Sequence, residues 1–306
     1  MRENKTGERP AVYIVVLNWN SWKDTVSCID SLKKITYGNY KILIVDNGSV
    51  DGSEEILKER FPELTLIQTG RNLGFAGGVN VGIKYALKEG ADYILLLNND
   101  TVVAPDFLDE LVKVAERDEG VGILCSKIYF YSEPDRIWYA GASFYSWIGF
   151  TVLRGCRRKD TGQFDTIEET EPTGCAMLLK RELCGKIGFF NEDYFCYYED
   201  LEFGMRARRA GFKTLYVPSS KLWHKVGETT KGSLAMLYYM MRNSLDFIDT
   251  YYPLPAVMRY IRYMLVAGMF SFYVLVTQGQ RFKGMKRIYQ GVRDYFNGRF
   301  GEFKQD

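Results

Sequence analysis

Three polar clusters in the first hundred residues carry side chains that can bind a nucleotide and a divalent cation. Each cluster directly follows an apolar run, and they read Asn18-Trp19-Asn20, Asp46-Asn47-Gly48-Ser49 and Asn98-Asn99-Asp100. The Asp46 carboxylate can accept a hydrogen bond from a nucleobase, and Asp100 offers the hard oxygen that Mg²⁺ or Mn²⁺ prefers on a diphosphate. A structural interpretation stays open for both, as an Asx turn at Asp46 and a simple loop at Asp100.

Two further groups can supply a proton acceptor and another ligand. Glu199 and Asp200 open a predicted helix, and a helix N-terminus favours the ionised carboxylate that a general base requires. The alternative is that Asp200 only caps this helix. His224 is the single histidine and follows a predicted strand, which makes it a candidate to converge with Asp100. A lone histidine can equally be packed or solvated without a ligand.

The glycine patterns of two common nucleotide-binding motifs are absent from the sequence. A dinucleotide fold requires G-x-G-x-x-G straight after the first strand, where this chain has LNWNSW, and the later glycines have a different spacing. A G-x-x-x-x-G-K-[ST] loop is also missing. Hydride transfer and P-loop phosphoryl transfer are therefore disfavoured, which leaves a nucleotide held by carboxylates, amides and a metal.

Alternating strands and helices position the first three clusters. The predicted strands are Val12–Leu17, Lys41–Val45, Leu64–Gln68 and Tyr93–Leu97, and the predicted helices are Ser21–Ile35, Ser53–Phe61, Gly78–Lys88 and Pro105–Arg117. Four such units predict an α/β fold with a mostly parallel central sheet, which binds ligands at its carboxyl edge. The second half is predicted to hold the strands Gly122–Tyr131, Trp138–Tyr145, Cys175–Lys180 and Lys213–Val217 and the helix Leu201–Ala210. The polar stretch 154–171 is expected to be a mobile loop.

The composition excludes several classes of protein. The chain has 306 residues, 46% of them hydrophobic, so it is neither disordered nor fibrous. Forty basic and 38 acidic residues give a net charge of +2, which is too small for a protein that neutralises a row of nucleic-acid phosphates. The six cysteines form no C-x-x-C pair, which suits reduced thiols in the cytosol rather than a zinc site. Residues 1–10 lack the apolar stretch of a secretory signal, so we expect a cytoplasmic location.

Residues 251–306 differ in composition from the rest of the chain. They hold nine basic and three acidic residues, a net +6, which leaves −4 for residues 1–250. Met264–Val276 is an apolar run of 13 residues, which is short for a bilayer span. Arg281–Phe296 is predicted as an amphipathic helix whose apolar face holds Phe282, Met285, Ile288, Tyr289, Val292 and Phe296. These features predict helices that lie on the inner face of a membrane, with an ordinary core or a homo-oligomer interface as the alternative.

Seven stretches occur together, in a fixed order, between residues 11 and 227: VVLNWN, ILIVDNGSVDGS, RNLGFAGGVNVGI, YILLLNNDTVV, TGCAMLLKR, FFNEDYFCYYEDLEFGMRARRAGF and VPSSKLWHKVG. In this respect the chain resembles the inverting nucleotide-sugar glycosyltransferases of family two, and among them the rhamnosyltransferase-like enzymes of cell-surface polysaccharide assembly. The resemblance implies a GT-A catalytic domain at 11–250, after a short extension at 1–10. The tail at 251–306 is expected to be a separate, membrane-associated helical part.

The resemblance implies that eight residues bind the nucleotide sugar. Asp46 corresponds to a contact with the pyrimidine, and a loop after the third predicted strand corresponds to the surroundings of the sugar diphosphate. The eight residues are Asn18, Asp46, Arg71, Asn72, Gly74, Asn80, Asn98 and Asn99.

The resemblance also implies a metal site and a general base. Asp100 and His224 correspond to ligands of Mn²⁺ or Mg²⁺ on the diphosphate, and a mixed oxygen and nitrogen set favours Mn²⁺. Asn98 replaces the first acid of the family's Asp-x-Asp motif, which leaves one carboxylate fewer for the cation. Asp200 corresponds to the base, with Glu199 beside it. It takes the proton of an acceptor hydroxyl that attacks the anomeric carbon from the face opposite the diphosphate.

The expected activity is transfer of rhamnose from dTDP-rhamnose to a lipid-linked or polysaccharide acceptor. A UDP-sugar donor stays open, as does a non-catalytic protein that binds a nucleotide sugar or a polysaccharide on the same fold. A processive polysaccharide synthase is disfavoured, because the sequence has no Gln-x-x-Arg-Trp motif and no array of spanning helices.

Overall fold

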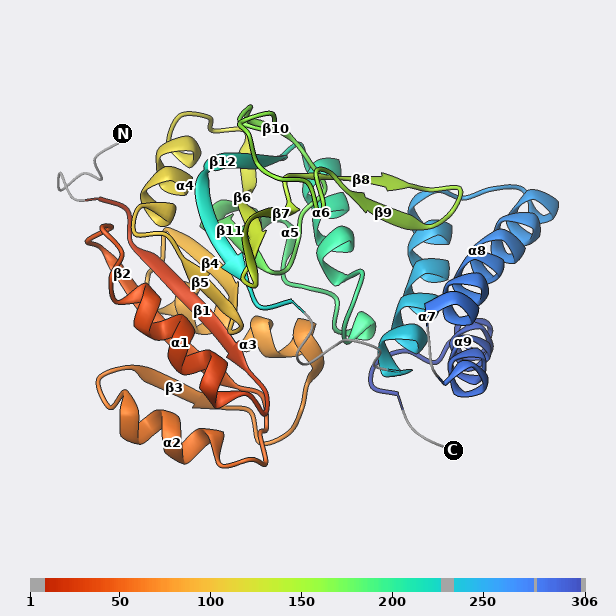
Figure 1. Cartoon of the computed structure of the whole chain (residues 1–306), viewed down its shortest axis with the longest axis horizontal. Helices are drawn as coiled ribbons and strands as arrows, with labels where there is room; N and C mark the ends of the chain where they lie inside the picture. Colours follow the sequence, from red (N-terminus) through yellow and green to blue (C-terminus); the bar gives the residue numbers. More distant parts are fainter. Residues whose placement is uncertain (1–8, 227–233, 278–279, 304–306) are drawn as a thin grey trace.

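A mixed sheet forms the centre of the computed structural model, which describes residues 9–226, 234–277 and 280–303 (Figure 1). Its strands are β1 Val12–Asn18, β2 Tyr40–Asp46, β3 Thr65–Gln68, β4 Tyr93–Asn98, β5 Thr101–Val103, β6 Val121–Phe130, β7 Glu133–Tyr139, β10 Glu168–Glu169, β11 Ala176–Lys180 and β12 Lys213–His224. The main path is β10-β12-β6-β11-β4-β1-β2-β3, with β5 beside β12 and β7 beside β6. Neighbours among β1 to β4 pair in parallel, as do β6 and β12, whereas β11 is antiparallel to both of its neighbours. The predicted α/β fold is confirmed: the sheet is parallel from β1 to β4, as the alternating units predict, and mixed in its second half.

Helices cover the sheet and bury its apolar strands. They are α1 Trp22–Leu32, α2 Ser53–Arg60, α3 Gly74–Lys88, α4 Phe107–Ala115, α5 Arg181–Ile187, the 3₁₀ helix η1 Glu192–Tyr194 and α6 Glu199–Arg209. α3 packs against β1 and β2, while α4 packs against β6 and β12. Because the central strands are covered on both faces, the apolar run of β1 is almost wholly buried, which matches its continuous rather than alternating hydrophobicity.

The second half of the sheet differs from the prediction in three places. The predicted strand 138–145 is broken at Gly141, whose φ is +99°, so that β7 stays in the central sheet and β8 Ala142–Tyr145 forms a separate hairpin with β9 Phe150–Leu153. β12 continues to His224, well beyond its predicted end at Val217, after an irregularity in its pairing with β6. Neither β5 nor α5 was predicted, because both are too short to show a clear period.

The stretch 154–171, expected to be mobile, is tied to the sheet by a buried cation. The Lys127 ammonium of β6 lies 2.8 Å from Asp160 Oδ2 and also contacts Asp165. Tyr129 donates a hydrogen bond of 2.6 Å to the same Asp160 oxygen. These contacts fix the loop beside β6, which sequence reasoning did not foresee.

The last three helices form a second hydrophobic cluster. α7 Leu234–Tyr251 packs closely against α9 Arg281–Phe296, and α8 Ala256–Thr277 packs against both. In Figure 1 they stand beside the sheet, with the β8–β9 hairpin reaching toward them. On the predicted apolar face of α9, Ile288 is buried, whereas Phe282, Tyr289 and Phe296 are exposed. Glycines on α9 bring its backbone close to α7.

Candidate active site

Three predicted side chains meet at one edge of the sheet. In the register of the parallel strands, Asn18 lies opposite Asp46, and Leu17 lies opposite Asn98. Because parallel strands end on the same side, the carboxyl ends of β1, β2 and β4 therefore form a single edge. This is the juxtaposition that the alternating pattern of the sequence predicts.

Asp46 presents one free carboxylate oxygen inside this edge. Its Oδ1 accepts a hydrogen bond of 3.0 Å from the Ser49 N–H, so the Asx turn considered from the sequence does form. Its Oδ2 is buried and has no hydrogen-bond partner among the described residues. Asn18 donates to the Ser49 hydroxyl at 3.1 Å and so holds the same turn. The structural and functional interpretations of Asp46 are thus compatible, since each uses a different oxygen.

Asn47 and Gly48 bring the loop before α3 against the end of β2. Asn47 donates to Asn72 Oδ1 at 3.1 Å and to the Gly74 carbonyl at 2.9 Å. At Gly48, where φ is +70°, a Cβ atom would lie 2.4 Å from the Arg71 carbonyl carbon. Arg71 itself is exposed. The loop residues expected around the nucleotide sugar therefore lie beside Asp46, although Asn47, which anchors them, was not among the predicted site residues.

Two asparagines connect the end of β4 to α1. Asn99 donates to the Thr25 hydroxyl at 2.9 Å, and Thr25 in turn donates to Asn18 Oδ1 at 2.7 Å. Asn98 is partly exposed at the end of β4, and its N–H donates to the Cys175 carbonyl at 2.9 Å. Thr25 thus connects Asn99 to Asn18, and its helical position gave no signal of this in the sequence.

Asp100 and His224 converge as expected. β5 pairs with β12 so that Thr101 lies opposite His224, which puts His224 Nε2 3.1 Å from Asp100 Oδ1. Burial lowers the pKa of His224, but the neighbouring Cys175 and Asp100 side chains outweigh it and raise the pKa to about 10. The other ring nitrogen, Nδ1, is buried without a hydrogen-bond partner in the described part of the chain. Asp100 and His224 therefore meet as an ion pair, and His224 would offer a nitrogen ligand beside the Asp100 oxygen once a bound cation displaced its proton.

The two acidic residues at the start of α6 have different surroundings. Asp200 Oδ2 accepts from the Gly174 N–H at 2.9 Å, and Oδ1 accepts from the Leu201 N–H at 2.8 Å. Burial raises the pKa of Asp200, although these two N–H groups partly offset the effect. Burial also raises the pKa of Glu199 well above its ordinary value, and the Asp200 carboxylate raises it further. The N-cap of α6 is Tyr198, so the alternative that Asp200 is the N-cap is wrong.

Residues 174 and 175 connect the acidic residue at α6 to the Asp100 and His224 pair. The Gly174 N–H binds Asp200, whereas the Cys175 side chain interacts with His224. Asp200 and His224 therefore lie on either side of one short stretch of chain. Neither Gly174 nor Cys175 was identified from the sequence as part of the site.

Asn80 makes its contacts within the protein. Its amide donates to the Phe190 carbonyl at 2.9 Å and to Glu192 Oε1 at 3.0 Å, and its Oδ1 accepts from the Phe190 N–H at 2.9 Å. These bonds fix the segment that leads toward α6. Its contact with the nucleotide sugar stays a prediction.

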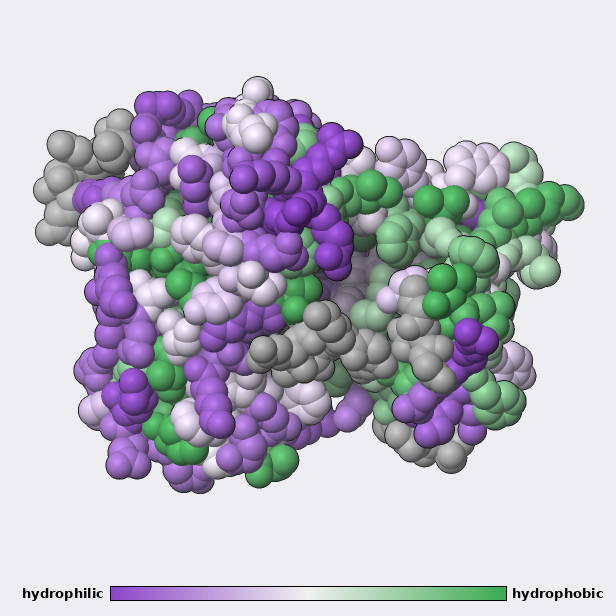
Figure 2. All heavy atoms as spheres, viewed as in Figure 1, coloured by the Kyte–Doolittle hydropathy of each residue, from purple (hydrophilic) through white to green (hydrophobic). Residues whose placement is uncertain are grey.

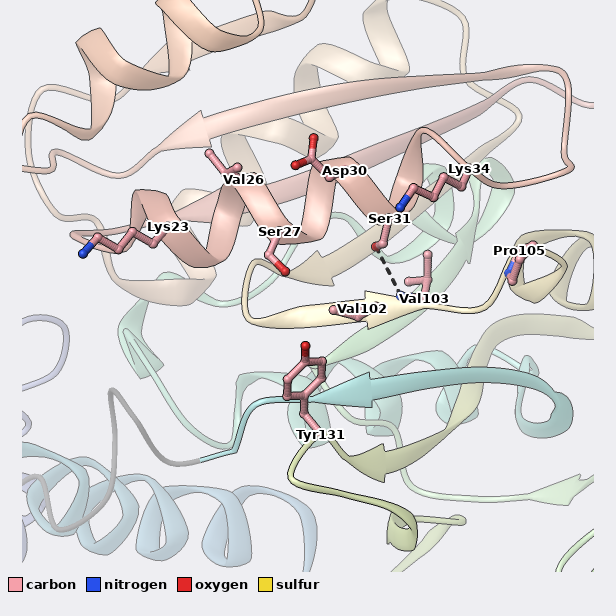
Figure 3. A pocket seen from close by; sticks show the side chains of 10 residues that line it. All are labelled: Lys23, Val26, Ser27, Asp30, Ser31, Lys34, Val102, Val103, Pro105 and Tyr131. Carbon is pink, nitrogen blue, oxygen red and sulfur yellow. Dashed lines mark hydrogen bonds between the residues drawn. The ribbon is translucent and has the colours of Figure 1, made fainter.

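A groove of about 430 Å³ lies on another face of α1 (Figure 3). It is lined by apolar, charged and hydroxyl side chains of α1, β5 and the following turn, and Tyr131 points toward it from the end of β6. None of the predicted site residues lines this groove. The candidate site is therefore the sheet edge itself.

Two solved structures have a similar fold. The mannosyltransferase PcManGT from Pyrobaculum calidifontis, in complex with GDP-Man and Mn²⁺, has a TM-score of 0.60 at 14% identity, covering 94% of this chain and 88% of that one. GalNAc-T7 with UDP, GalNAc and Mn²⁺ has a TM-score of 0.62 at 15% identity, covering 88% and 58%. At such low identities these similarities establish the fold, which is the GT-A fold that the sequence predicts.

Similar sequences establish the family. The N-acetylglucosaminyl-diphospho-decaprenol L-rhamnosyltransferase of Mycobacterium tuberculosis is 30% identical over 226 residues, which cover 65% of this chain and 71% of that protein. The dTDP-rhamnosyl transferase RfbF of Shigella flexneri is 22% identical and covers 94% of this chain and 96% of its own. Residues 13–188 match the family described as Glycosyl transferase family 2. The chain therefore belongs to glycosyltransferase family 2, and it is a glycosyltransferase with the GT-A fold.

Proposed function

We propose that this enzyme transfers rhamnose from dTDP-rhamnose to a lipid-linked or polysaccharide acceptor, with inversion at the anomeric carbon. Two relatives that are rhamnosyltransferases by name support the choice of sugar, and the name of the mycobacterial relative supports a lipid-linked acceptor. The observation that carries the proposal is the grouping of a free Asp46 oxygen, the Asp100 and His224 pair, and Asp200 around one sheet edge.

The donor lies along the ends of β1, β2 and β4. The free, buried Oδ2 of Asp46 accepts a hydrogen bond from the N–H of the pyrimidine, a contact that also compensates its burial. The loop that Asn47 anchors covers the ribose and diphosphate, with Arg71 free to approach the phosphates. Asn18 and Asn99 hold the floor of this site through Thr25.

A divalent cation fits the residues beside the diphosphate. Asp100 and His224 offer an oxygen and a nitrogen donor, and no group of three or more His, Cys, Asp or Glu suited to a metal occurs among the described residues. The remaining ligands would be diphosphate oxygens and water, which is common for Mg²⁺ and Mn²⁺ in nucleotide sites. When bound, the cation stabilises the negative charge that develops on the leaving diphosphate. Mn²⁺ in the two similar structures supports a divalent ion.

Asp200 acts as the general base. Its carboxylate receives the proton of the acceptor hydroxyl as that oxygen attacks the anomeric carbon, and the Gly174 and Leu201 N–H groups keep it oriented. Because burial raises its pKa, this carboxylate is a stronger proton acceptor than an exposed aspartate. Glu199 lies beside Asp200 at the start of α6, where burial and the Asp200 carboxylate raise its pKa well above the ordinary value.

Ligand-induced thermal stabilisation tests the choice of donor. With Mn²⁺ present, dTDP-rhamnose should raise the melting temperature, because a ligand at 100 times its Kd stabilises the folded state by about 2.7 kcal/mol. UDP-sugars and GDP-mannose serve as matched controls. Stabilisation by a UDP-sugar but not by dTDP-rhamnose would overturn the rhamnosyl assignment. Donor binding without any transfer to a lipid-linked acceptor would favour the non-catalytic alternative.

We further propose that the tail attaches the enzyme to the cytoplasmic face of an anionic membrane. α8 carries an exposed row of large apolar side chains, with Met264 76% and Phe272 69% exposed, and Figure 2 shows hydrophobic residues gathered in this part of the molecule. Ala256–Val276 is long and apolar enough to cross a membrane, although we propose that it lies on the surface. Exposed Lys283 and Lys286 on α9 supply attraction to anionic lipid.

The β8–β9 hairpin extends the same surface into the catalytic domain. Phe150 packs on Phe270 of α8 with ring centroids 6.4 Å apart, which fixes the hairpin against the tail. Its tip exposes Trp147 and Ile148, and an indole ring suits the membrane interface. Attachment through both the tail and the hairpin would hold Asp200 at a fixed distance from a lipid-linked acceptor.

Vesicle flotation of the full chain tests this attachment. The wild type should float with vesicles that contain phosphatidylglycerol and much less with pure phosphatidylcholine, and the double variant M264S/F272S should lose about 10-fold in partition. V50S, which removes an exposed valine elsewhere, is the matched control. Unchanged flotation of the double variant would contradict the proposal. Concentration-dependent dimers that the same variant abolishes would show that a second copy covers this surface instead.

A further inference from the structure

The segment directly before the proposed base has an unusual backbone. Phe195, Tyr197 and Tyr198 have φ values of +60°, +67° and +72°, in a region that bulky side chains rarely adopt. Tyr198 is also the N-cap of α6, so its conformation sets the direction in which Glu199 and Asp200 leave the segment. Such conformations persist only where the surrounding structure holds them, and they concentrate at functional sites. The contacts that hold 193–198 therefore matter for the position of Asp200.

A buried Asn–Arg pair on α7 supplies these contacts. The Asn243 amide donates to the carbonyl oxygens of Tyr194, Cys196 and Tyr197 at 2.9, 3.0 and 2.7 Å. Arg242 Nη2 donates to the carbonyls of Asp193 and Tyr194 at 3.0 and 3.2 Å. Both side chains are completely buried.

Arg242 also connects this segment to the end of the described chain. Its Nη1 donates to the Gly301 carbonyl at 2.8 Å, and the Gly301 N–H donates to the Asp193 carbonyl at 2.8 Å. Arg242 Nε donates to Asn243 Oδ1 at 2.9 Å, so the two side chains form one unit. The buried Arg242 guanidinium thus donates several hydrogen bonds to main-chain carbonyls. Burial of a charged group costs free energy, so we expect this arrangement where the backbone geometry that it fixes is needed.

The opposite side of the segment contacts the loop before α3, which we propose covers the donor. The Phe195 carbonyl accepts from the Ala76 N–H at 3.2 Å, at the start of α3. A Cβ atom at Gly74 would lie 2.3 Å from that carbonyl oxygen, so the two segments can meet only with a glycine there. The segment 193–198 is therefore held between the donor loop and α7.

We propose that Arg242 and Asn243 are positioning residues for Asp200: α7 holds the main-chain turn that aims the base at the acceptor hydroxyl. This inference rests on the proposed role of Asp200. It makes the helices next to the proposed membrane surface part of the catalytic apparatus, because α7 packs directly on α8 and α9. A purely structural role for the pair would instead lower stability without a specific effect on turnover.

Steady-state kinetics with separate kcat and KM values distinguish the two roles. N243A should lower kcat about 10- to 100-fold, as expected for a displaced catalytic group, while the KM for the donor changes less than about threefold. R242K keeps the charge but not the forked donor geometry, and it should show the same pattern more weakly. L245A removes a fully buried apolar side chain of the same helix. It should lower the melting temperature as much as N243A does but leave kcat nearly unchanged.

A double-mutant cycle with Asp200 separates failure of this inference from failure of the proposed function. If N243A acts through the base, then adding it to D200N should lower kcat no further. Equal loss of kcat in both backgrounds would overturn the positioning role, as would equal kcat losses in N243A and L245A. If D200N alone retained turnover, the proposed base would be wrong, whatever the effect of N243A. Should N243A fail to fold, R242K enters the same cycle with the same criteria.

Discussion

The proposed donor side of the active-site edge, at the ends of β1, β2 and β4, and the proposed base side, around Asp200, are built from different kinds of contact. On the donor side, Asn18, Asp46 and Asn98 each end a strand, and strand register alone brings them together. On the base side, Asp200 is held by Gly174 and by a turn that α7 fixes from much later in the sequence. The proposed donor site therefore depends mainly on the sheet, whereas the proposed base depends on packing between the sheet and the C-terminal helices.

The largest effect is expected at Asp200, where a substitution should lower turnover without weakening donor binding. D200N removes the proton acceptor, so kcat should fall about 1,000-fold, while the Kd of the donor stays within about threefold because the nucleotide contacts are untouched. Calorimetric binding of the donor, run beside turnover measurements, checks both values. Comparable loss of binding and turnover would mean that Asp200 belongs to the donor side.

Substitutions in the Asp100 and His224 pair should change cation binding on the donor side and leave the base side unaffected. D100N leaves His224 as a single protein ligand, so Mn²⁺ affinity in the presence of nucleotide should fall about 10- to 100-fold. N98D is the matched opposite, since it adds the carboxylate that the Asp-x-Asp pattern otherwise has, and it should tighten Mn²⁺ binding about threefold. Electron paramagnetic resonance of Mn²⁺ measures both. Equal Mn²⁺ affinities in all three proteins would exclude this metal site.

Loss of the nucleobase contact should have a smaller effect. In D46N the oxygen that accepts from the pyrimidine N–H can be replaced by an amide N–H, so the donor Kd should rise about 10-fold. The kcat at saturating donor should change little, because the base side is unaffected. Equal affinity for dTDP-rhamnose in D46N and wild type would remove Asp46 from the nucleotide site.

The smallest effect is expected at Glu199. E199Q mimics the neutral side chain, so kcat should stay within about threefold of wild type. A carboxyl group whose folded pKa is raised stabilises the protein fully only below its unfolded pKa of about 4.3, and this contribution is lost as pH rises through the folded pKa. Melting temperatures from pH 4 upward should therefore fall more steeply for wild type than for E199Q. Parallel curves would show that Glu199 is ionised throughout.

The sequence predicts for a physical reason that the ends of β1, β2 and β4 meet. Buried parallel strands have continuous apolar runs, and the polar residues that end them must share one edge. Asp46 and Asp100 could therefore be identified from their position alone. The anchors Asn47 and Thr25 could not, because their importance lies in the partners they meet across the fold.

Contacts between distant parts of the chain, at the base side and in the tail, could not be predicted from the sequence. Asp200 was identified as the base through the family resemblance, but nothing local in the sequence marks Asn243 or Arg242, whose partners lie about fifty residues earlier. The face of α9 that packs on α7 could not be predicted either, because hydrophobic periodicity does not register the close approach that small residues allow. The division of the chain into a catalytic domain and a tail at residue 250 stays a prediction. In the structure, α7, which precedes this point, packs with the tail helices.

Transfer of labelled rhamnose is the most direct test of the whole account. Wild-type enzyme, Mn²⁺ and dTDP-rhamnose would be combined with a polyprenyl-linked N-acetylglucosaminyl diphosphate, with D200N as the parallel reaction. We predict labelled lipid product with wild type and at least about 100-fold less with D200N. Transfer from a UDP-sugar but not from dTDP-rhamnose, or equal product from both proteins, would contradict the account.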